Sequence, residues 1–138
     1  MPFFMEGEQF LKKIYLYHDG FESPAAAFLA NLSPKQLAKI RRQLSVLRDF
    51  PHAFGEPHVK HFQIERYREL YELREKCGNT LIRIVFSYDE AENILLLEPF
   101  LKTKSRDTCR ALERALGYLE DIRASPEAFL IEYDIKGE

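Results

Sequence analysis

The feature that most constrains the fold is a run of three β-prone segments separated by turns too short for a crossover. Apolar and polar side chains alternate in part over residues 70–76. Residues 80–88 are rich in β-branched and aromatic side chains, and residues 94–101 are almost wholly apolar. Residues 77–79 and 89–93 hold the Gly, Asn and Asp that favour tight turns. A parallel connection needs roughly a dozen residues or more. The middle of the chain is therefore predicted to be an antiparallel meander.

Two helix starts precede this meander. Ser23-Pro24 places an N-cap Ser before a Pro at the first helical position, and an Ala-rich run follows. Ser33-Pro34 repeats this signal, and Gln36 completes a capping box. The second helix is predicted to end by Phe50, and one stripe of its residues has the helical spacing of a core face: Leu37, Ile40, Leu44 and Leu47. We expect the two helices to form a hairpin against the sheet.

The segments on either side complete the order of elements. Residues 9–17 are aromatic-rich and end before an Asp-Gly turn signal, so they are predicted to form the first strand. Residues 51–69 are predicted to be a long loop with a short strand near 58–62. Behind a cap at Ser105 or Asp107, an amphipathic helix is predicted from apolar residues at helical spacing: Cys109, Leu112, Leu116, Leu119 and Ile122. We interpret Cys109 as a core residue on that stripe.

The predicted order is β-α-α-β-β-β-α, an α+β fold in which the helical hairpin and the C-terminal helix pack on a small antiparallel-rich sheet. The 138 residues fit a single domain. Its core is expected at about 9–123, after a poorly ordered leader at 1–8 and before a short C-terminal extension at 124–138. Within that extension, Ser125-Pro126 begins an element whose type the sequence leaves open, and residues 134–138 are expected to fray.

Composition predicts a cytoplasmic protein. No apolar run approaches the roughly 18 residues of a membrane span. The first residues lack the basic and apolar regions of a secretory signal. Two cysteines are too few for a disulfide framework and suit a reducing compartment.

The basic residues are concentrated in the middle of the chain. The net charge is -2, yet residues 35–106 hold 14 of the 20 lysines and arginines, between two acidic ends. Such asymmetry gives an anion-binding face if the basic side chains converge in space, and an ordinary mixed surface if they do not.

Two arginines in the meander are the leading candidates for such a face. In a strand, Arg74 points to the opposite face from Tyr71 and Leu73, and Arg83 points to the opposite face from its large apolar neighbours. If the apolar faces pack on the helices, both arginines project from the open face of the sheet. A basic segment follows the last strand: Lys102, Thr103, Lys104 and Arg106. Guanidinium groups match phosphate oxygens, so the cluster is interpreted as a phosphate site. The alternative is that each arginine pairs with a carboxylate, such as Glu72, Glu75 or Glu98.

Other chemistries find less support. The sequence contains no P-loop, dinucleotide fingerprint or nucleophile elbow. His58 and His61 could join Cys77 or Cys109 as metal ligands, but no Cys-x-x-Cys spacing accompanies them. Neither a metal nor a cofactor is therefore predicted.

The ordered set of motifs resembles the RelE/HigB-like toxin superfamily, in particular its phage-derived-protein branch. Residues 55–60, GEPHVK, look like the loop before the second strand of that branch, and residues 70–74, LYELR, look like its most recognisable strand. Residues 81–86, LIRIVF, resemble the next strand, and residues 94–102, ILLLEPFLK, resemble the last strand with its basic exit. The resemblance covers about four fifths of the chain.

The resemblance implies an mRNA endoribonuclease of a type II toxin–antitoxin system that acts on the ribosome without a metal or cofactor. In such enzymes the ribose 2′-OH attacks the adjacent phosphate. At matching positions, Arg74 and Arg83 would bind the scissile phosphate, and Lys102 would assist there or in proton transfer. Contacts to flanking RNA would come from Lys60, Tyr88, Lys104 and Arg106, with Tyr88 stacking on a base. The implied partners are mRNA, the ribosome and a cognate antitoxin, expected to be of helix-turn-helix type, and a homodimer is left open.

The sequence departs from the branch pattern near the end of the last strand. Glu98 and Pro99 replace the usual His and small residue, and Thr103 replaces a Lys. Glu98 shares strand parity with Lys102 and is predicted to neutralise the site in part. Pro99 removes a ladder donor and predicts an edge or a bulge. A second hypothesis is therefore a non-catalytic protein that keeps the fold and binds a partner chain or RNA without cutting it.

Overall fold

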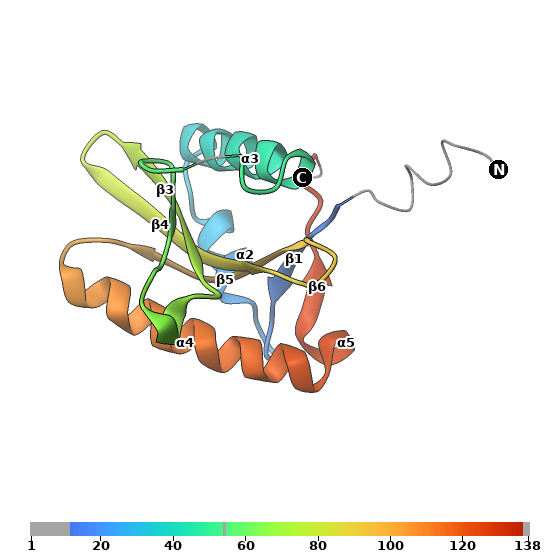
Figure 1. Ribbon diagram of the computed structural model, residues 1–138. Coiled ribbons are helices and arrows are strands. Elements are labelled where there is room, and N and C mark those ends of the chain that lie inside the picture. The colour runs from blue at the N-terminus through green and yellow to red at the C-terminus, as the bar shows by residue number, and fades with distance from the viewer. Residues whose placement is uncertain (1–11, 54, 137–138) are drawn as a thin grey trace.

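The computed structural model describes residues 12–53 and 55–136 and shows an α+β fold built on one six-stranded mixed sheet (Figure 1). In chain order the elements are β1 (Ile14–Tyr17), α2 (Pro24–Ala30), α3 (Pro34–Asp49), β2 (Val59–His61), the 3-10 helix η1 (Glu65–Tyr67), β3 (Tyr71–Cys77), β4 (Thr80–Tyr88), β5 (Ile94–Leu101), α4 (Ser105–Ala124), α5 (Pro126–Phe129) and β6 (Leu130–Glu132). The leader predicted at 1–8 and the start of the predicted first strand lie outside the described residues. None of the helices in the two described ranges has both the length and the apolar character that a bilayer crossing requires.

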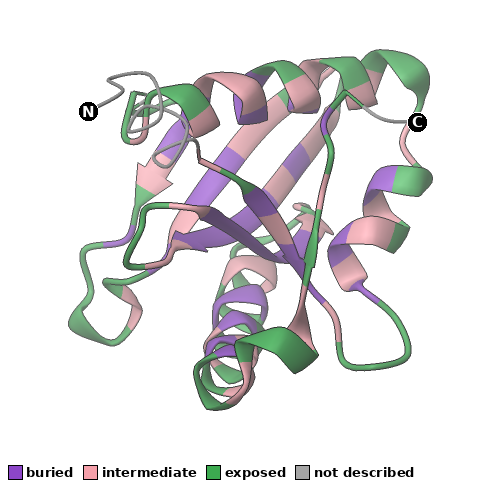
Figure 2. Cartoon of the chain, turned by 90° about the vertical axis from the view of Figure 1, so that its right-hand side faces the viewer, coloured by how far each residue is buried: buried purple, intermediate pink, exposed green. Residues whose placement is uncertain are grey.

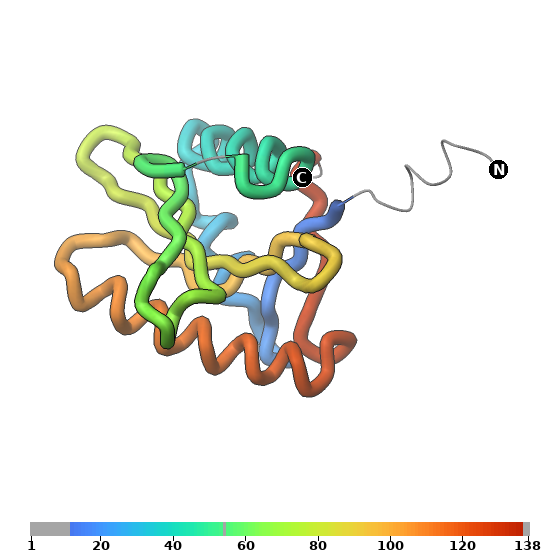
Figure 3. Tube along the Cα trace, in the orientation of Figure 1, coloured from blue at the N-terminus to red at the C-terminus, as the bar shows by residue number. Residues whose placement is uncertain are grey.

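The strands lie in the order β2-β3-β4-β5-β1-β6. The pairs from β2 to β5 are antiparallel, which confirms the meander and the short strand near 58–62. β1 pairs in parallel with β5, and β6 pairs antiparallel with β1. In Figure 3 the blue N-terminal strand accordingly runs between β5 and the red C-terminal segment. The sheet is larger than predicted, because the three-residue strand β6 is too short to leave a periodic pattern. It is mixed because β1 joins β5 in parallel.

Helices cover the sheet on both faces. α2 and α3 pack on one face, where the buried cluster includes Ile40, Leu44, Ile84 and Phe86. α4 packs on the other face, against a second cluster that includes Leu70, Val85 and Leu97. Figure 2 shows buried residues along the strands and on the side of α4 that is turned toward the sheet. No face of the sheet is therefore wholly open.

The predicted helix starts are confirmed. Ser23 caps α2, and its hydroxyl accepts the N–H of Ala26 at 3.1 Å. At the start of α3, the Ser33 hydroxyl accepts the N–H of Gln36 at 3.1 Å, and the Gln36 side chain accepts the N–H of Ser33 at 3.0 Å. Each helix has Pro at its first position, where the missing N–H costs nothing.

The prediction that Cys109 belongs to the core is wrong, since its side chain is exposed. The buried face of α4 is centred instead on two alanines, and it comprises Ala111, Leu112, Ala115, Leu119 and Ile122. Cys109 precedes Ala111 by two residues, which is about 200° around the helix, so it points away from the sheet.

Residues 130–135 are more ordered than the sequence indicated. β6 extends the sheet, and Ile135 is buried in the α3-side cluster, although residues 134–138 were expected to fray. The Tyr133 N–H donates to the Ile14 carbonyl at 2.8 Å, which ties this segment to β1. Residues 137–138 lie outside the described ranges.

Candidate active site

Arg74 and Arg83 stand directly opposite each other on neighbouring strands. The β3–β4 register pairs Arg74 with Arg83 and, two residues along, Glu72 with Val85. Side chains alternate along a strand, so these four share one face, and Val85 belongs to the cluster under α4. The fold therefore brings the two arginines together at one end of the face that α4 covers in part.

A buried carboxylate lies between the two guanidinium groups. The side chain of Glu72 is 0% exposed, and its Oε1 lies 2.9 Å from Arg74 Nε and 3.6 Å from Arg83 Nε. Its second oxygen, Oε2, and the Nε of Arg83 are both buried and have no hydrogen-bond partner among the described residues. Glu72 thus holds the arginines side by side, although neither its own nor their hydrogen-bonding capacity is fully used.

The prediction that both arginines project from an open face is wrong. The Arg74 side chain is 22% exposed and that of Arg83 only 12%. Burial lowers the pKa of Arg83; the negative charge of Glu72 acts against this shift, and the positive charge of Arg74 adds to it. The arginines form a partly desolvated pair of cations, in which electrostatic interactions with an anion are stronger than at a free surface.

Two lysines belong to the same face. Lys60 on β2 is in register with Glu72, and its ammonium lies 5.3 Å from the centre of the Phe62 ring. Lys102 follows β5, and its N–H donates to the Leu81 carbonyl at 2.9 Å. Strand alternation gives Lys102 the parity of Phe100, the residue paired with Arg83. The Lys102 side chain forms no ion pair with any residue that the structure describes.

The other carboxylates considered as partners for the arginines are used elsewhere. Glu98 is buried and accepts hydrogen bonds from Tyr118 at 2.9 Å and from Arg114 at 3.1 Å, both on α4. Glu75 accepts a hydrogen bond from Gln43 and lies 3.9 Å from the ammonium of Lys39. Glu98 therefore anchors α4, and the prediction that it neutralises the site is not supported by any contact with Lys102 among the described residues.

Pro99 lies on a part of β5 that is an edge toward β1, and the bulge lies two residues earlier, at Leu97. β1 pairs with β5 only as far as Leu96, so Pro99 has no strand on that side. On the other side, the register with β4 shifts between Val85 and Phe86, which leaves an extra residue on β5 before Glu98. The missing N–H of Pro99 is tolerated there.

Lys104 and Arg106 lie at the start of α4, and both are exposed. Lys104 is the N-cap residue, and the Asp107 carboxylate accepts the N–H groups of Thr103 at 2.9 Å and Lys104 at 3.0 Å. These hydrogen bonds lower the pKa of Asp107 from 3.8 to about 2. The predicted N-cap at Ser105 or Asp107 is therefore wrong, because both residues lie inside the helix. Asp107, at the third helical position, instead fixes the backbone that carries the basic segment.

Tyr88 is not brought together with the arginines. It shares the parity of Phe86 and Ile84 and packs against the cluster under α3, on the opposite face of the sheet from Arg83. Its role as a stacking partner at the arginine site stays a prediction that this geometry does not favour.

Two residues of this site were not assigned by the sequence. The sequence indicated Glu72 only as a carboxylate that could pair with the arginines. Strand alternation already places it on the same face of the sheet as Arg74. His58 lines a cavity of about 320 Å³ together with Arg74 and Arg83, and its carbonyl accepts the Arg74 N–H at 2.8 Å. His61, three residues along, has the opposite parity and stacks on Tyr71. The two histidines therefore face different sides of the sheet.

The fold and this site define a small α+β protein whose sheet carries a partly desolvated, cationic face. The family model of phage-derived protein Gp49-like (DUF891) matches residues 27–119, which is about two thirds of the chain. The chain therefore belongs to this Gp49-like family, which is associated with toxin–antitoxin systems. The match contains the whole meander and both arginines of the site. No curated protein matches the chain at a significant level.

Proposed function

We propose that this protein is the toxin of a type II toxin–antitoxin pair, of the RelE/HigB-like kind, and that it cleaves mRNA on the ribosome. The observation that supports this most is the pairing of Arg74 with Arg83 around Glu72, at a cavity of about 320 Å³. Arg74, Arg83, Lys60 and Lys102 share one face, so cations outnumber carboxylates there. A phosphodiester has the charge and the oxygen geometry that this cluster binds.

The proposed reaction is attack of a ribose 2′-OH on the adjacent phosphate, which gives a 2′,3′-cyclic phosphate and a 5′-OH. The phosphorus passes through a five-coordinate state with additional negative charge on its oxygens. Arg74 and Arg83 stabilise that charge, and Lys102 assists at the phosphate or in proton transfer. His58 lines the same cavity and is the second candidate for moving a proton between the 2′-OH and the leaving oxygen.

The proposed partners follow from the charge of the site. Lys60, Lys104 and Arg106 contact the RNA backbone on either side of the scissile phosphate, as exposed or half-buried cations. A cognate antitoxin neutralises the protein by covering the cationic face. The cytoplasm is the compartment in which translated mRNA and such an antitoxin are both present.

The second candidate function is a non-catalytic binding protein with the same fold. The observation that favours it is Glu72, which already supplies an anion to both arginines. A bound phosphate must then share the guanidinium groups with this carboxylate. The two functions differ in one measurable property, the appearance of new RNA ends.

The deciding experiment is induced expression in a bacterial host, with growth recorded and RNA 5′ ends mapped. Wild type is compared with Arg83→Lys and with Lys102→Ala. Arg83→Lys keeps a positive charge beside the buried Glu72 but removes the guanidinium fork. Arg42→Ala is the matched control, since Arg42 is exposed on α3, the helix on the opposite face.

The proposed activity predicts growth arrest and new 5′-OH ends on translated messages for wild type and for Arg42→Ala. Both effects should be lost, or reduced at least tenfold, in Arg83→Lys and Lys102→Ala. Normal growth and no new ends, with folded wild-type protein present in the cells, would reject the nuclease and favour the non-catalytic binder.

A further inference from the structure

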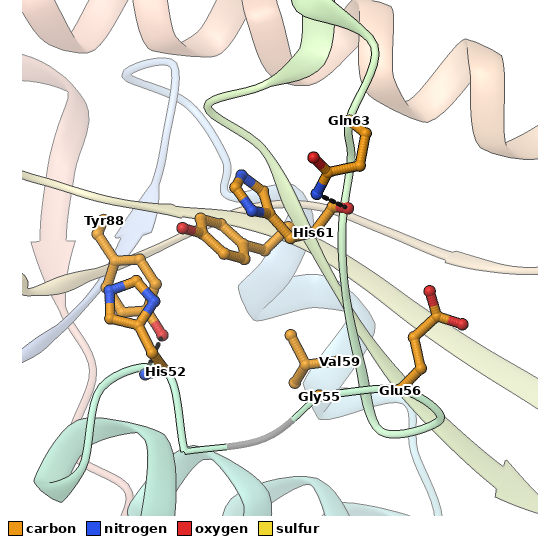
Figure 4. A pocket seen from close by; sticks show the side chains of 8 residues that line it. His52, Gly55, Glu56, Val59, His61, Gln63 and Tyr88 are labelled. Carbon is orange, nitrogen blue, oxygen red and sulfur yellow. Dashed lines mark hydrogen bonds between the residues drawn. The ribbon is translucent and has the colours of Figure 1, made fainter.

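A second cavity lies on the opposite face of the sheet from the arginines. It measures about 310 Å³, and its walls include His52, Glu56, His61, Gln63, Tyr71 and Tyr88, over a floor at Gly55 and Val59. Figure 4 shows His52 and Tyr88 at one end of this cavity and Glu56 at the other, with His61 and Gln63 along one side. Ligand cavities begin at roughly 300 Å³, so this one suits a single small planar group.

Aromatic rings form most of the wall. The His61 and Tyr71 rings are stacked, with centroids 4.2 Å apart and 12° between their planes. Tyr88 meets Tyr71 edge-on at 5.1 Å, and His52 lies 4.5 Å from Tyr88. Part of this surface is accessible, because His52 and His61 are exposed and the two tyrosines are half-buried. Flat π surfaces that reach solvent offer a stacking platform.

Hydrogen bonds hold these rings in place without a ligand. The Tyr88 hydroxyl accepts the His52 N–H at 3.2 Å, and His52 adopts a left-handed backbone with φ 68°. The Nε2 of His61 lies 2.7 Å from the Arg68 carbonyl, and the Gln63 amide donates to the His61 carbonyl at 3.2 Å. A preformed wall loses little entropy when a ligand binds.

The cavity borders the cationic site through one residue. Glu56 lines the aromatic cavity, and its Oε1 also lies 3.9 Å from the Nη1 of Arg74 on the other face. The segment that carries Glu56 leads directly into β2, the edge strand of the sheet. A single strand that passes around this edge can therefore contact the arginines with a phosphate and the aromatic cavity with a base.

We propose that this cavity binds one unpaired nucleobase of the RNA strand whose phosphate contacts Arg74 and Arg83. The base stacks on the His61–Tyr71 side, and its polar edge meets Gln63 and Glu56. The site favours single-stranded RNA, because a paired base can enter the cavity only after its pairing and stacking free energy has been lost. This inference rests on the proposed function, in that it requires the chain to bind RNA.

The test uses a 2′-O-methyl tetranucleotide, which cannot undergo 2′-OH attack, and a matched tetranucleotide with one abasic position. Both carry the same number of phosphates, so their difference in affinity isolates the base. Binding is measured by fluorescence anisotropy for wild type, His61→Ala, Gln63→Ala and Arg83→Lys, with thermal melts to verify that each variant is folded. A panel of oligomers with the abasic site at each position locates the base that enters the cavity.

We expect the abasic oligomer at one position to bind wild type about tenfold more weakly than the intact one, as stacking on an aromatic side chain predicts. That difference should shrink to less than about threefold in His61→Ala, and Gln63→Ala should reduce it in part. Arg83→Lys should weaken both oligomers equally and leave their ratio unchanged, because it alters only the phosphate contact.

Equal binding of intact and abasic oligomers at every position, or an unchanged ratio in a folded His61→Ala variant, would overturn the base site. Failure of wild type to bind any of the oligomers would overturn it as well. The proposed function is judged separately by RNA cleavage in the expression experiment. Cleavage without a base-dependent affinity would retain the nuclease and remove only the cavity's role.

Discussion

Replacing Glu72 with Gln removes the buried negative charge that lies between two guanidinium groups on adjacent strands. The carboxylate is fully buried, and both Arg74 Nε and Arg83 Nε lie within 3.6 Å of the same oxygen. Gln has nearly the same volume, so no cavity forms, and its amide oxygen can still accept one hydrogen bond. The effect therefore isolates the lost negative charge.

The expected size of the effect follows from the burial of this cluster. Removing one partner of a buried ion pair costs about 3–5 kcal/mol. The arginine side chains are 22% and 12% exposed, so water screens them in part, and about 2–4 kcal/mol is the appropriate range. For a chain of this size, about 4 °C of melting temperature corresponds to each kcal/mol, which predicts a decrease of about 8–16 °C.

The assay is urea unfolding followed by circular dichroism, in a double-mutant cycle of Glu72→Gln with Arg83→Gln. The double variant should be more stable than the sum of the single effects predicts, by about 1–3 kcal/mol, because it removes both charges of the Glu72–Arg83 pair and leaves neither of these two without the other. A loss below about 1 kcal/mol for Glu72→Gln, or strict additivity in the cycle, would refute the reasoning. The same ion pair explains why Arg83→Ala should also destabilise the protein.

Three further changes test other parts of the structure. Glu98→Gln should keep RNA cleavage, since Glu98 faces α4, but lose about 1–3 kcal/mol in urea unfolding because it accepts hydrogen bonds from that helix. Ser33→Ala should cost about 1 kcal/mol by removing the α3 capping box, and unchanged stability would contradict the cap. The pKa of Glu113 is lowered from 4.5 to about 2 by hydrogen bonds from Arg66 and Tyr67. Its stabilisation is therefore present above pH 4.5 and lost as the pH falls toward 2, and acid titration of Glu113→Gln should show a shallower loss than wild type.

The site owes its properties to the combination of two arginines with one buried acid. Two cations held side by side without an anion would repel each other, and a fully neutralised pair would bind no phosphate. Glu72 contacts both arginines through one oxygen and leaves the Nε of Arg83 without a hydrogen bond. The Glu72 side chain thus acts as a positioning group in the proposed mechanism, while Lys60 and Lys102 keep the face cationic.

The local sequence determined most of the secondary structure. Caps at Ser23 and Ser33, turns after β3 and β4, and the alternation along β4 each depend on residues within a few positions, and the structure confirms them. The parity that places Arg74 and Arg83 on one face is also local, because adjacent antiparallel strands joined by a tight turn have little freedom of register.

Tertiary structure decided what each face of the sheet meets. Alternation shows which residues share a side, but not whether a helix covers that side, so the sequence could not indicate that Arg83 is nearly buried. The parallel position of β1 and the addition of β6 depend on contacts between segments about 80 or more residues apart, as in the pairing of Ile14 with Ile94. The same long-range packing turns Cys109 outward and places Tyr88 at the second cavity. Pairing across such distances is fixed by the total burial of the folded chain, which no short stretch of sequence contains.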